Sequence, residues 1–189
     1  MKVITLLGSP KKKGNTAKVL GWCEEALMER GHEVERVNLA GLDVRGCLGC
    51  GVCKKSSDKI GCVQKDDVPA LFGRMMASDA VIYASPVYFW DFSSQMKTLM
   101  DRHCSLVTDF GGPNHASLLE NKRTALLMTC EDQVENNADL VQELFDRFND
   151  YLKCTVVGKY VTPFCTTPDV LGAEARATAV KIALDIAGE

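Results

Sequence analysis

The sequence predicts an α/β domain in which a parallel sheet is covered by helices on both faces. Short apolar runs rich in β-branched residues alternate along the chain with longer segments of helical period. Parallel strands need helical crossovers, which leave helices on both faces of the sheet. The chain has 189 residues, of which 46% are hydrophobic, enough for one substantial core. We therefore expect residues 1–189 to form a single domain.

The expected strands and helices take turns from one end of the chain to the other. Five segments with short apolar runs or alternating patterns predict strands at 3–7, 33–39, 80–84, 124–129 and 155–161. Five segments with apolar residues three and four apart predict helices at 15–31, 66–78, 96–107, 134–152 and 172–187. Asn15 or Thr16 is expected to cap the first helix, and an aspartate the second. Two long stretches, the cysteine segment after the second strand and 108–122, fit neither pattern, which is typical of functional connections.

Charge and composition exclude several classes of protein. The net charge is −3, with 22 basic and 25 acidic residues, so the chain lacks the positive field that collects nucleic acid or anionic lipid. The sequence contains neither a signal peptide nor an apolar run long enough to span a membrane, and we expect a cytoplasmic protein. Its nine cysteines should then stay reduced, which favours metal or redox roles for some of them. Ordinary packing is expected for five: Cys23, Cys104, Cys130, Cys154 and Cys165.

The loop after the first strand, GSPKKKGNT at 8–16, predicts an anion site. It matches neither a nucleotide P-loop nor a GxGxxG motif. It does place small and hydroxyl residues at the start of a helix, where backbone N–H groups bind a phosphate; these are Ser9, Gly14, Asn15 and Thr16. About one of Lys11, Lys12 and Lys13 is expected to touch the ligand, and the others to face solvent.

Two further loops should meet the first at the carboxyl edge of the sheet. SPVYFWDF at 85–92 groups three aromatic residues, a pattern typical of a planar ligand or a subunit interface. TCEDQ at 129–133 can supply backbone donors and acceptors to a ligand's edge. Acid and base side chains are scarce, because no histidine has an identifiable acidic partner. The chemistry is therefore expected to belong to a bound cofactor.

The segments GSPKKKGNT and DAVIYASPVYFWDFSSQMKTLMDR, together with the order of elements, resemble the flavodoxin-like NAD(P)H-dependent FMN reductases over essentially the whole chain. The resemblance implies a three-layer sandwich whose five-stranded parallel sheet has the order 2-1-3-4-5, and FMN bound without a covalent link. It implies phosphate contacts from Ser9, Lys11, Asn15 and Thr16, and isoalloxazine contacts from Pro86, Val87, Tyr88 and Phe89. The loop with Thr129 and Glu131 departs from the family's glycine-rich pattern, although the same contacts to FMN are implied there.

The segment GCLGCGVCKKSSDKIGC at 46–62 places four thiols where they could share one ligand: Cys47, Cys50, Cys53 and Cys62. Iron and zinc both accept four thiolates, so spacing leaves a [4Fe–4S] cluster, zinc and empty thiols as alternatives. The glycines between the cysteines are expected to let the run curl. The run resembles the iron–sulfur flavoproteins, whose cysteine motif holds a [4Fe–4S] cluster, with a slightly longer gap before the fourth cysteine.

These observations predict an FMN-dependent oxidoreductase that passes reducing equivalents from NAD(P)H to a flavin, a quinone, a metal ion or a small aromatic acceptor. With no second nucleotide-binding unit in the sequence, the nicotinamide is expected to stack on the flavin. One alternative is an electron carrier between protein partners, using flavin and cluster; another is a flavin-binding sensor or scaffold. Apolar residues at Phe89, Trp90 and Phe110 predict a homodimer, or a dimer of dimers, that covers the flavin.

Overall fold

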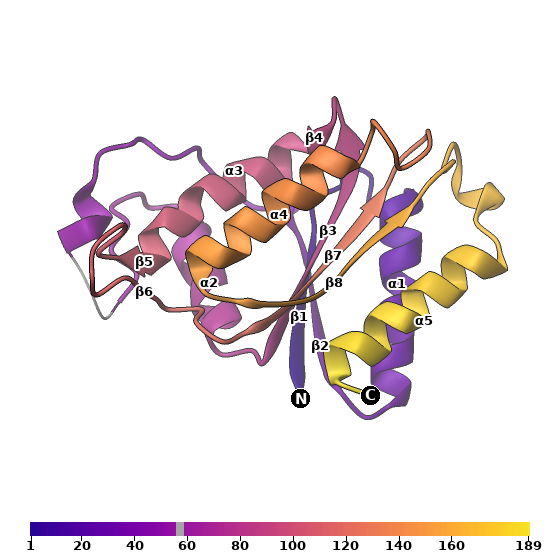
Figure 1. Ribbon diagram of the computed structural model, residues 1–189, viewed down its shortest axis with the longest axis horizontal. Coiled ribbons are helices and arrows are strands. Elements are labelled where there is room, and N and C mark those ends of the chain that lie inside the picture. The colour runs from indigo at the N-terminus through magenta and orange to yellow at the C-terminus, as the bar shows by residue number, and fades with distance from the viewer. Residues whose placement is uncertain (56–58) are drawn as a thin grey trace.

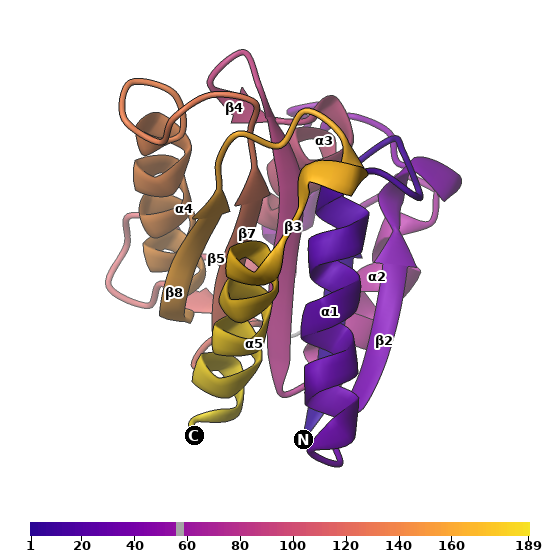
Figure 2. The same cartoon turned by 90° about the vertical axis from the view of Figure 1, so that its right-hand side faces the viewer.

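A parallel sheet of five long strands runs through the middle of the molecule and carries helices on both faces (Figures 1 and 2). The structure is a computed structural model and describes residues 1–55 and 59–189. The parallel strands are β1 (Lys2–Leu7), β2 (Glu33–Asn38), β3 (Ala80–Tyr88), β7 (Arg123–Thr129) and β8 (Thr155–Thr162). Their order in the sheet is β2-β1-β3-β7-β8, which confirms the predicted order 2-1-3-4-5.

The helices cover the two faces unequally, as Figure 2 shows. Two of them share one hydrophobic core with one face of the sheet: α1 (Asn15–Glu29) and α5 (Ala173–Ala187). Three cover the other face: α2 (Val68–Met76), α3 (Ser94–Arg102) and α4 (Asp139–Leu152). Strand β1 feeds both cores, because successive side chains point to opposite faces of a sheet: Val3 packs with α1 and α5, and Ile4 with the other three.

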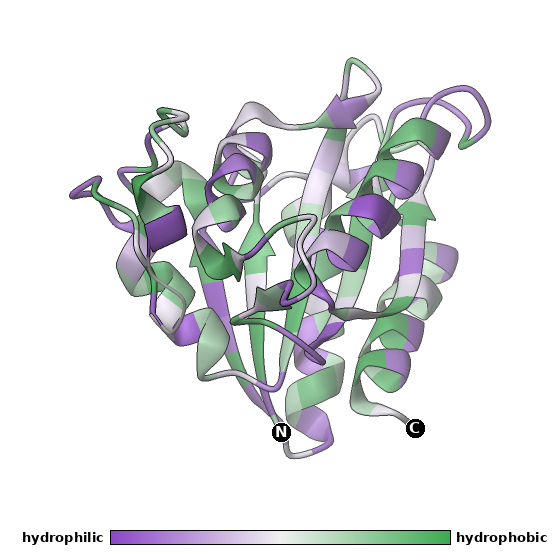
Figure 3. Cartoon of the chain, turned by 60° about the vertical axis from the view of Figure 1, so that its left-hand side comes forward, coloured by the Kyte–Doolittle hydropathy of each residue, from purple (hydrophilic) through white to green (hydrophobic). Residues whose placement is uncertain are grey.

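The helices present apolar stripes to the sheet, as their periodicity predicts. In Figure 3 they carry bands of hydrophobic and hydrophilic residues, the pattern of helices with one buried face. The expected capping at the start of α1 is wrong. Gly14 is the N-cap, and the side chains of Asn15 and Thr16 bond to other loops instead. At α2 the N-cap Asp67 makes no side-chain cap bond, whereas its neighbour Asp66 accepts one from the Val68 N–H at 3.2 Å.

Several short elements lie outside the main alternation. In residues 1–55 and 59–189 they are four 3₁₀ turns and three short strands: η1 (Leu39–Gly41), η2 (Val52–Lys55), η3 (His103–Leu106), η4 (Pro168–Val170), β4 (Asp91–Phe92), β5 (Val107–Thr108) and β6 (Ala116–Ser117). The third helix therefore ends at Arg102 and not at 107, because the chain tightens into η3 and then pairs β5 with β6. That pairing orders part of the stretch 108–122, for which the sequence predicted no regular structure.

A buried histidine links α3 to the sheet. The Nδ1 atom of His103 lies 3.0 Å from the Leu99 carbonyl oxygen and must donate to it, so Nε2 accepts from the Tyr83 hydroxyl at 3.2 Å. Burial lowers the pKa of His103 from its ordinary 6.5 to about 4. The histidine is thus neutral in the folded protein.

This histidine should make the protein less stable in mild acid. At pH 5 the unfolded chain protonates His103 and the folded chain does not, so stability falls as the pH drops from about 6.5 toward about 4. We expect a loss of about 2 kcal/mol between pH 7 and pH 5 from this group. Urea unfolding at both pH values, on the wild type and on His103→Gln, measures it. The variant should be less stable at pH 7 but lose less on acidification; an equal loss in both would contradict the assignment.

Candidate functional site

The loops at the carboxyl ends of the strands enclose a cavity of about 720 Å³. All eleven residues expected to bind FMN line it: Ser9, Lys11, Gly14, Asn15, Thr16, Pro86, Val87, Tyr88, Phe89, Thr129 and Glu131. They come from three loops that lie far apart in the sequence and meet because their strands are parallel neighbours in the sheet. The cavity volume is in the range of ordinary cofactor sites.

In the first loop, the side chains of Asn15 and Thr16 hold the cavity wall together. The Asn15 amide nitrogen donates to the Cys165 carbonyl oxygen at 2.6 Å, and the Thr16 hydroxyl lies 2.8 Å from the Thr129 hydroxyl in a buried contact. The groups available to an anion are therefore the backbone N–H groups of the first turn of α1, together with Ser9 and Lys11. The first N–H groups of a helix have no intrahelical partner and carry the positive end of its dipole, which favours a phosphate there.

In the second loop, the chain reverses sharply after β3. Phe89 and Trp90 have φ values of 49° and 62°, and they turn the chain so that β4 pairs back on β3. Positive φ is uncommon for bulky residues, but the tight two-residue turn of a β-hairpin requires it at both central positions. The hairpin leaves Phe89 90% exposed and Trp90 55% exposed, with their ring centroids 6.2 Å apart. Large apolar side chains in that position suit a planar ligand or a second protein surface.

Part of the cavity wall was not predicted from the sequence. It comprises Glu135, Asn136, Asn137, Cys165 and Thr166, whereas Trp90, Cys130, Asp132 and Gln133 belong to the two loops that were expected to meet the ligand. The two cysteines meet through backbone bonds, since the Cys165 N–H donates to the Cys130 carbonyl oxygen at 2.8 Å. Burial raises the pKa of the Cys165 thiol to about 11 and also raises that of Cys130, so both stay protonated at neutral pH. Neither is poised as a nucleophile, and the part of the wall that the structure describes contains no histidine.

A second cavity, of about 190 Å³, is lined mainly by the cysteine segment. All four cysteines expected to hold a metal line it, namely Cys47, Cys50, Cys53 and Cys62, together with Cys104, Arg102 and Lys54. Gly49 and Gly51 have φ values of 62° and 68°, so the run curls as predicted. The Gly49 N–H also points at the Cys47 sulfur, 3.5 Å away. In residues 1–55 and 59–189, no three His, Cys, Asp or Glu side chains are arranged to hold a metal ion.

The helix α3 ends at the cysteine cavity, which its last residue, Arg102, lines. At its N-terminal end the Ser93 hydroxyl donates to the carbonyl oxygen of Gly8, the first residue of the loop at 8–16, at 2.6 Å. At its C-terminal end Cys104 lines the cysteine cavity. Nine residues of helix separate these points, about 14 Å at the usual rise. The cysteine segment leaves β2 at the carboxyl edge of the sheet, as expected, but its thiols gather beyond the far end of α3.

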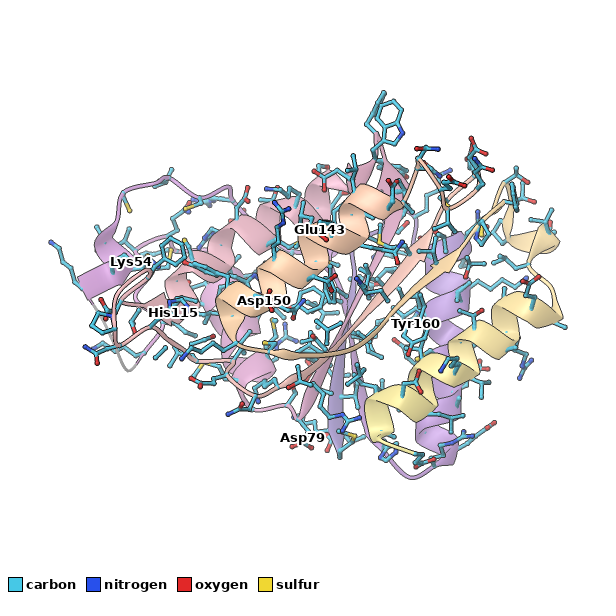
Figure 4. All side chains as sticks on the ribbon, viewed as in Figure 1. Lys54, Asp79, His115, Glu143, Asp150 and Tyr160 are labelled. Atoms are coloured by element: carbon cyan, nitrogen blue, oxygen red, sulfur yellow. The ribbon has the colours of Figure 1, made fainter. Side chains whose placement is uncertain are left out.

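Cys104 is a further candidate for a functional residue, because it lines the cysteine cavity. Its helical sequence pattern had predicted ordinary packing. Its sulfur lies 3.8 Å from the sulfur of Cys47. Burial and the contact with Cys47 raise the pKa of Cys104 to about 12. The Lys54 ammonium fastens the cysteine segment here, donating to the carbonyl oxygens of Cys104 at 2.6 Å and Val107 at 2.9 Å. Figure 4 shows Lys54 close to His115, at the same end of the molecule.

The chain is similar in sequence to known iron–sulfur flavoproteins. Over 102 residues, 54% of the chain, it is 43% identical to an iron–sulfur flavoprotein from Archaeoglobus fulgidus and 40% identical to one from Methanocaldococcus jannaschii. The matches cover 45% and 51% of those proteins, so the chain spans about half the length of the curated relatives it matches.

In the part of the chain described, no helix is both long enough and apolar enough to cross a membrane.

Solved structures share the fold at low sequence identity. A flavone reductase matches all of this chain and 62% of its own, with a TM-score of 0.76 and 18% identity. An NAD(P)H:quinone oxidoreductase from Methanothermobacter marburgensis matches 100% of this chain and 99% of its own, with a TM-score of 0.72 and 17% identity. At these identities the likeness shows the fold alone. The family described as NADPH-dependent FMN reductase matches residues 1–166, and the chain belongs to that family.

Proposed function

We propose that the protein is an FMN-dependent oxidoreductase that takes reducing equivalents from NAD(P)H and passes them to a quinone, a flavin, a metal ion or a small aromatic acceptor. The observation that carries the proposal is the convergence of three loops on one cavity in a member of the FMN reductase family. The solved neighbours that reduce quinones or azo compounds share the fold and so support a reductase of this general class.

The residues present fit FMN. The first turn of α1, with Ser9 and Lys11, would hold the phosphate, while Pro86, Val87 and Tyr88 would lie along the ring system. When bound, FMN supplies the hydride and electron transfer chemistry, which the side chains of this chain cannot supply themselves. The chain's own part is to bind, orient and shield. Its buried Thr16–Thr129 contact joins the first and third loops, so that one rigid wall would contact both the phosphate and the ring system of FMN.

The cysteine cavity supports a [4Fe–4S] cluster held by Cys47, Cys50, Cys53 and Cys62. A cluster of several atoms spreads its thiolates around a larger volume, which suits a cavity of about 190 Å³ lined by five thiols. This cavity also favours a second candidate function, an electron carrier between protein partners that uses flavin and cluster without a small substrate.

The exposed hairpin supports a homodimer or a dimer of dimers. Phe89 and Trp90 stand at the rim of the FMN cavity, where a second copy could cover them. Phe110, which was expected on the same rim, instead packs on Tyr151 with ring centroids 4.8 Å apart. Figure 1 shows its segment, between β5 and β6, on the side of the cysteine segment and away from β4. We place the protein in the cytoplasm, where its free thiols would stay reduced.

Anaerobic kinetics separate the two candidate functions. The reductase should oxidise NAD(P)H with a small acceptor, and initial rates at several acceptor concentrations should give parallel lines, because donor and acceptor use one ring face in turn. A quinone and free FMN are suitable acceptors to test. Intersecting lines would indicate a ternary complex with a separate acceptor pocket. Absence of NAD(P)H oxidation in the FMN-loaded protein would reject the reductase and leave the electron carrier.

A further inference from the structure

A buried arginine joins the two ends of the cysteine segment. Arg102, the last residue of α3, donates from Nη1 to the Arg45 carbonyl oxygen at 2.7 Å, just before the first cysteine. It also forms a two-point ion pair with Asp66, just after the last cysteine; Nη2 lies 3.2 Å from the Asp66 Oδ1 atom. The Asp66 carboxylate in turn accepts from the Arg45 N–H at 3.1 Å. One guanidinium therefore joins the backbone before Cys47 to the carboxylate that follows Cys62.

The same guanidinium contacts one thiol of the cysteine cavity, that of Cys62. Its Nη2 atom lies 3.2 Å from the Cys62 sulfur, and Arg102 is part of the wall of the cysteine cavity. The pair is buried almost completely, with side-chain exposures of 1% for Arg102 and 0% for Asp66. Burying two charges is costly, and packing alone could be achieved with apolar residues of similar size. The pair's position beside a sulfur indicates an electrostatic role as well.

We propose that Arg102 is a positioning residue for the metal centre: it holds Cys62 in place and raises the reduction potential of the cluster, and Asp66 counteracts part of that rise. The inference rests on the proposed cluster. Thiolate clusters are anionic, and reduction by one electron adds a further negative charge. An N–H donor at a ligand sulfur stabilises the more negative form, and hydrogen bonds to sulfur are among the factors that set cluster potentials.

The test of this role is whether replacing Arg102 and replacing Asp66 shift the midpoint potential of the cluster in opposite directions. After anaerobic reconstitution with iron and sulfide, the midpoint potential is measured by a redox titration followed by electron paramagnetic resonance. Arg102→Met removes the donor and the positive charge, and should lower the potential. Asp66→Asn leaves the guanidinium uncompensated, and should raise it. A purely structural role would give no shift, or shifts in the same direction.

Two further variants complete the test: one covers the case in which Arg102→Met does not fold, and the other is a control. Arg102→Met leaves the Asp66 charge buried without its partner, so the double variant Arg102→Met/Asp66→Asn removes both charges together. It should lower the potential, because the donor to Cys62 is gone. Arg36→Met is the matched control, since it breaks another ion pair, with Glu24, that joins β2 to α1 and does not line the cysteine cavity. It should leave the potential unchanged.

The outcomes separate this inference from the function on which it rests. A wild type that takes up no iron on reconstitution overturns both the cluster and the role of Arg102. In a second outcome, the wild type holds its cluster, and Asp66→Asn and the double variant both have the wild-type midpoint potential. This result overturns only the role of Arg102. Shifts of opposite sign in Asp66→Asn and the variants without Arg102, with Arg36→Met unchanged, are the expected result.

Discussion

Replacing Cys50 by serine is expected to remove nearly all the iron that the wild type binds after anaerobic reconstitution with iron and sulfide. Clusters of this kind are held by four thiolates, and a hydroxyl is a poor substitute. Cys50 is exposed and lines the cysteine cavity, so its loss should not disturb the core. Iron per chain and the visible spectrum measure the effect. The flavin spectrum should be retained, because the FMN cavity shares no lining residue with this one.

Cys104→Ser is the matched control for this prediction. Cys104 lines the same cavity and lies 3.8 Å from the Cys47 sulfur, but it comes from η3 and not from the cysteine segment. We expect this variant to keep its iron. An equal loss of iron in both variants would show that Cys104 is itself a ligand. A wild type with only a flavin spectrum after reconstitution would reject the cluster altogether.

The parallel sheet could be predicted from the sequence because periodicity records burial directly, whereas its strand order was implied by the resemblance to the FMN reductases. A run such as Val3 to Leu7 has a buried side chain at every position, as expected of a short strand covered on both faces. The meeting of three loops at one cavity followed from the same information. Once the strands are parallel, their carboxyl ends coincide, and the loops at 8–16, 85–92 and 129–133 must meet.

Contacts between distant segments were not within reach, because no local pattern specifies them. Cys104 follows a helix and has the spacing of a core residue, yet the tightening of the chain into η3 carries it into the cysteine cavity. The bond from Asn15 to the carbonyl oxygen of Cys165 joins residues 150 positions apart. Asn15 is also a good capping residue, so the sequence favoured a local role that the tertiary contact replaced.

The protein is expected to bind FMN more tightly than riboflavin, by several kcal/mol. The two molecules differ only by the phosphate, which would sit on the unpaired N–H groups at the start of α1. Each charge-assisted hydrogen bond to such a phosphate contributes about 1.5 to 3 kcal/mol. Fluorescence titrations of the apoprotein with both flavins measure the difference. Equal affinities would remove the basis for assigning the loop at 8–16 to phosphate.

Two substitutions in that loop should act differently, because their hydroxyls face different partners. Thr16→Ala breaks a buried contact with Thr129 that joins two loops, and should weaken FMN and riboflavin alike. Ser9→Ala removes a hydroxyl that lines the cavity and makes only long bonds to Lys11, of 3.2 and 3.3 Å, so it is free to turn to a phosphate. It should weaken FMN and leave riboflavin nearly unchanged. The ratio of the two affinities thus tells a phosphate contact from a loop support, and a Thr16→Ala effect confined to FMN would mean that its hydroxyl leaves Thr129 for the phosphate when FMN binds.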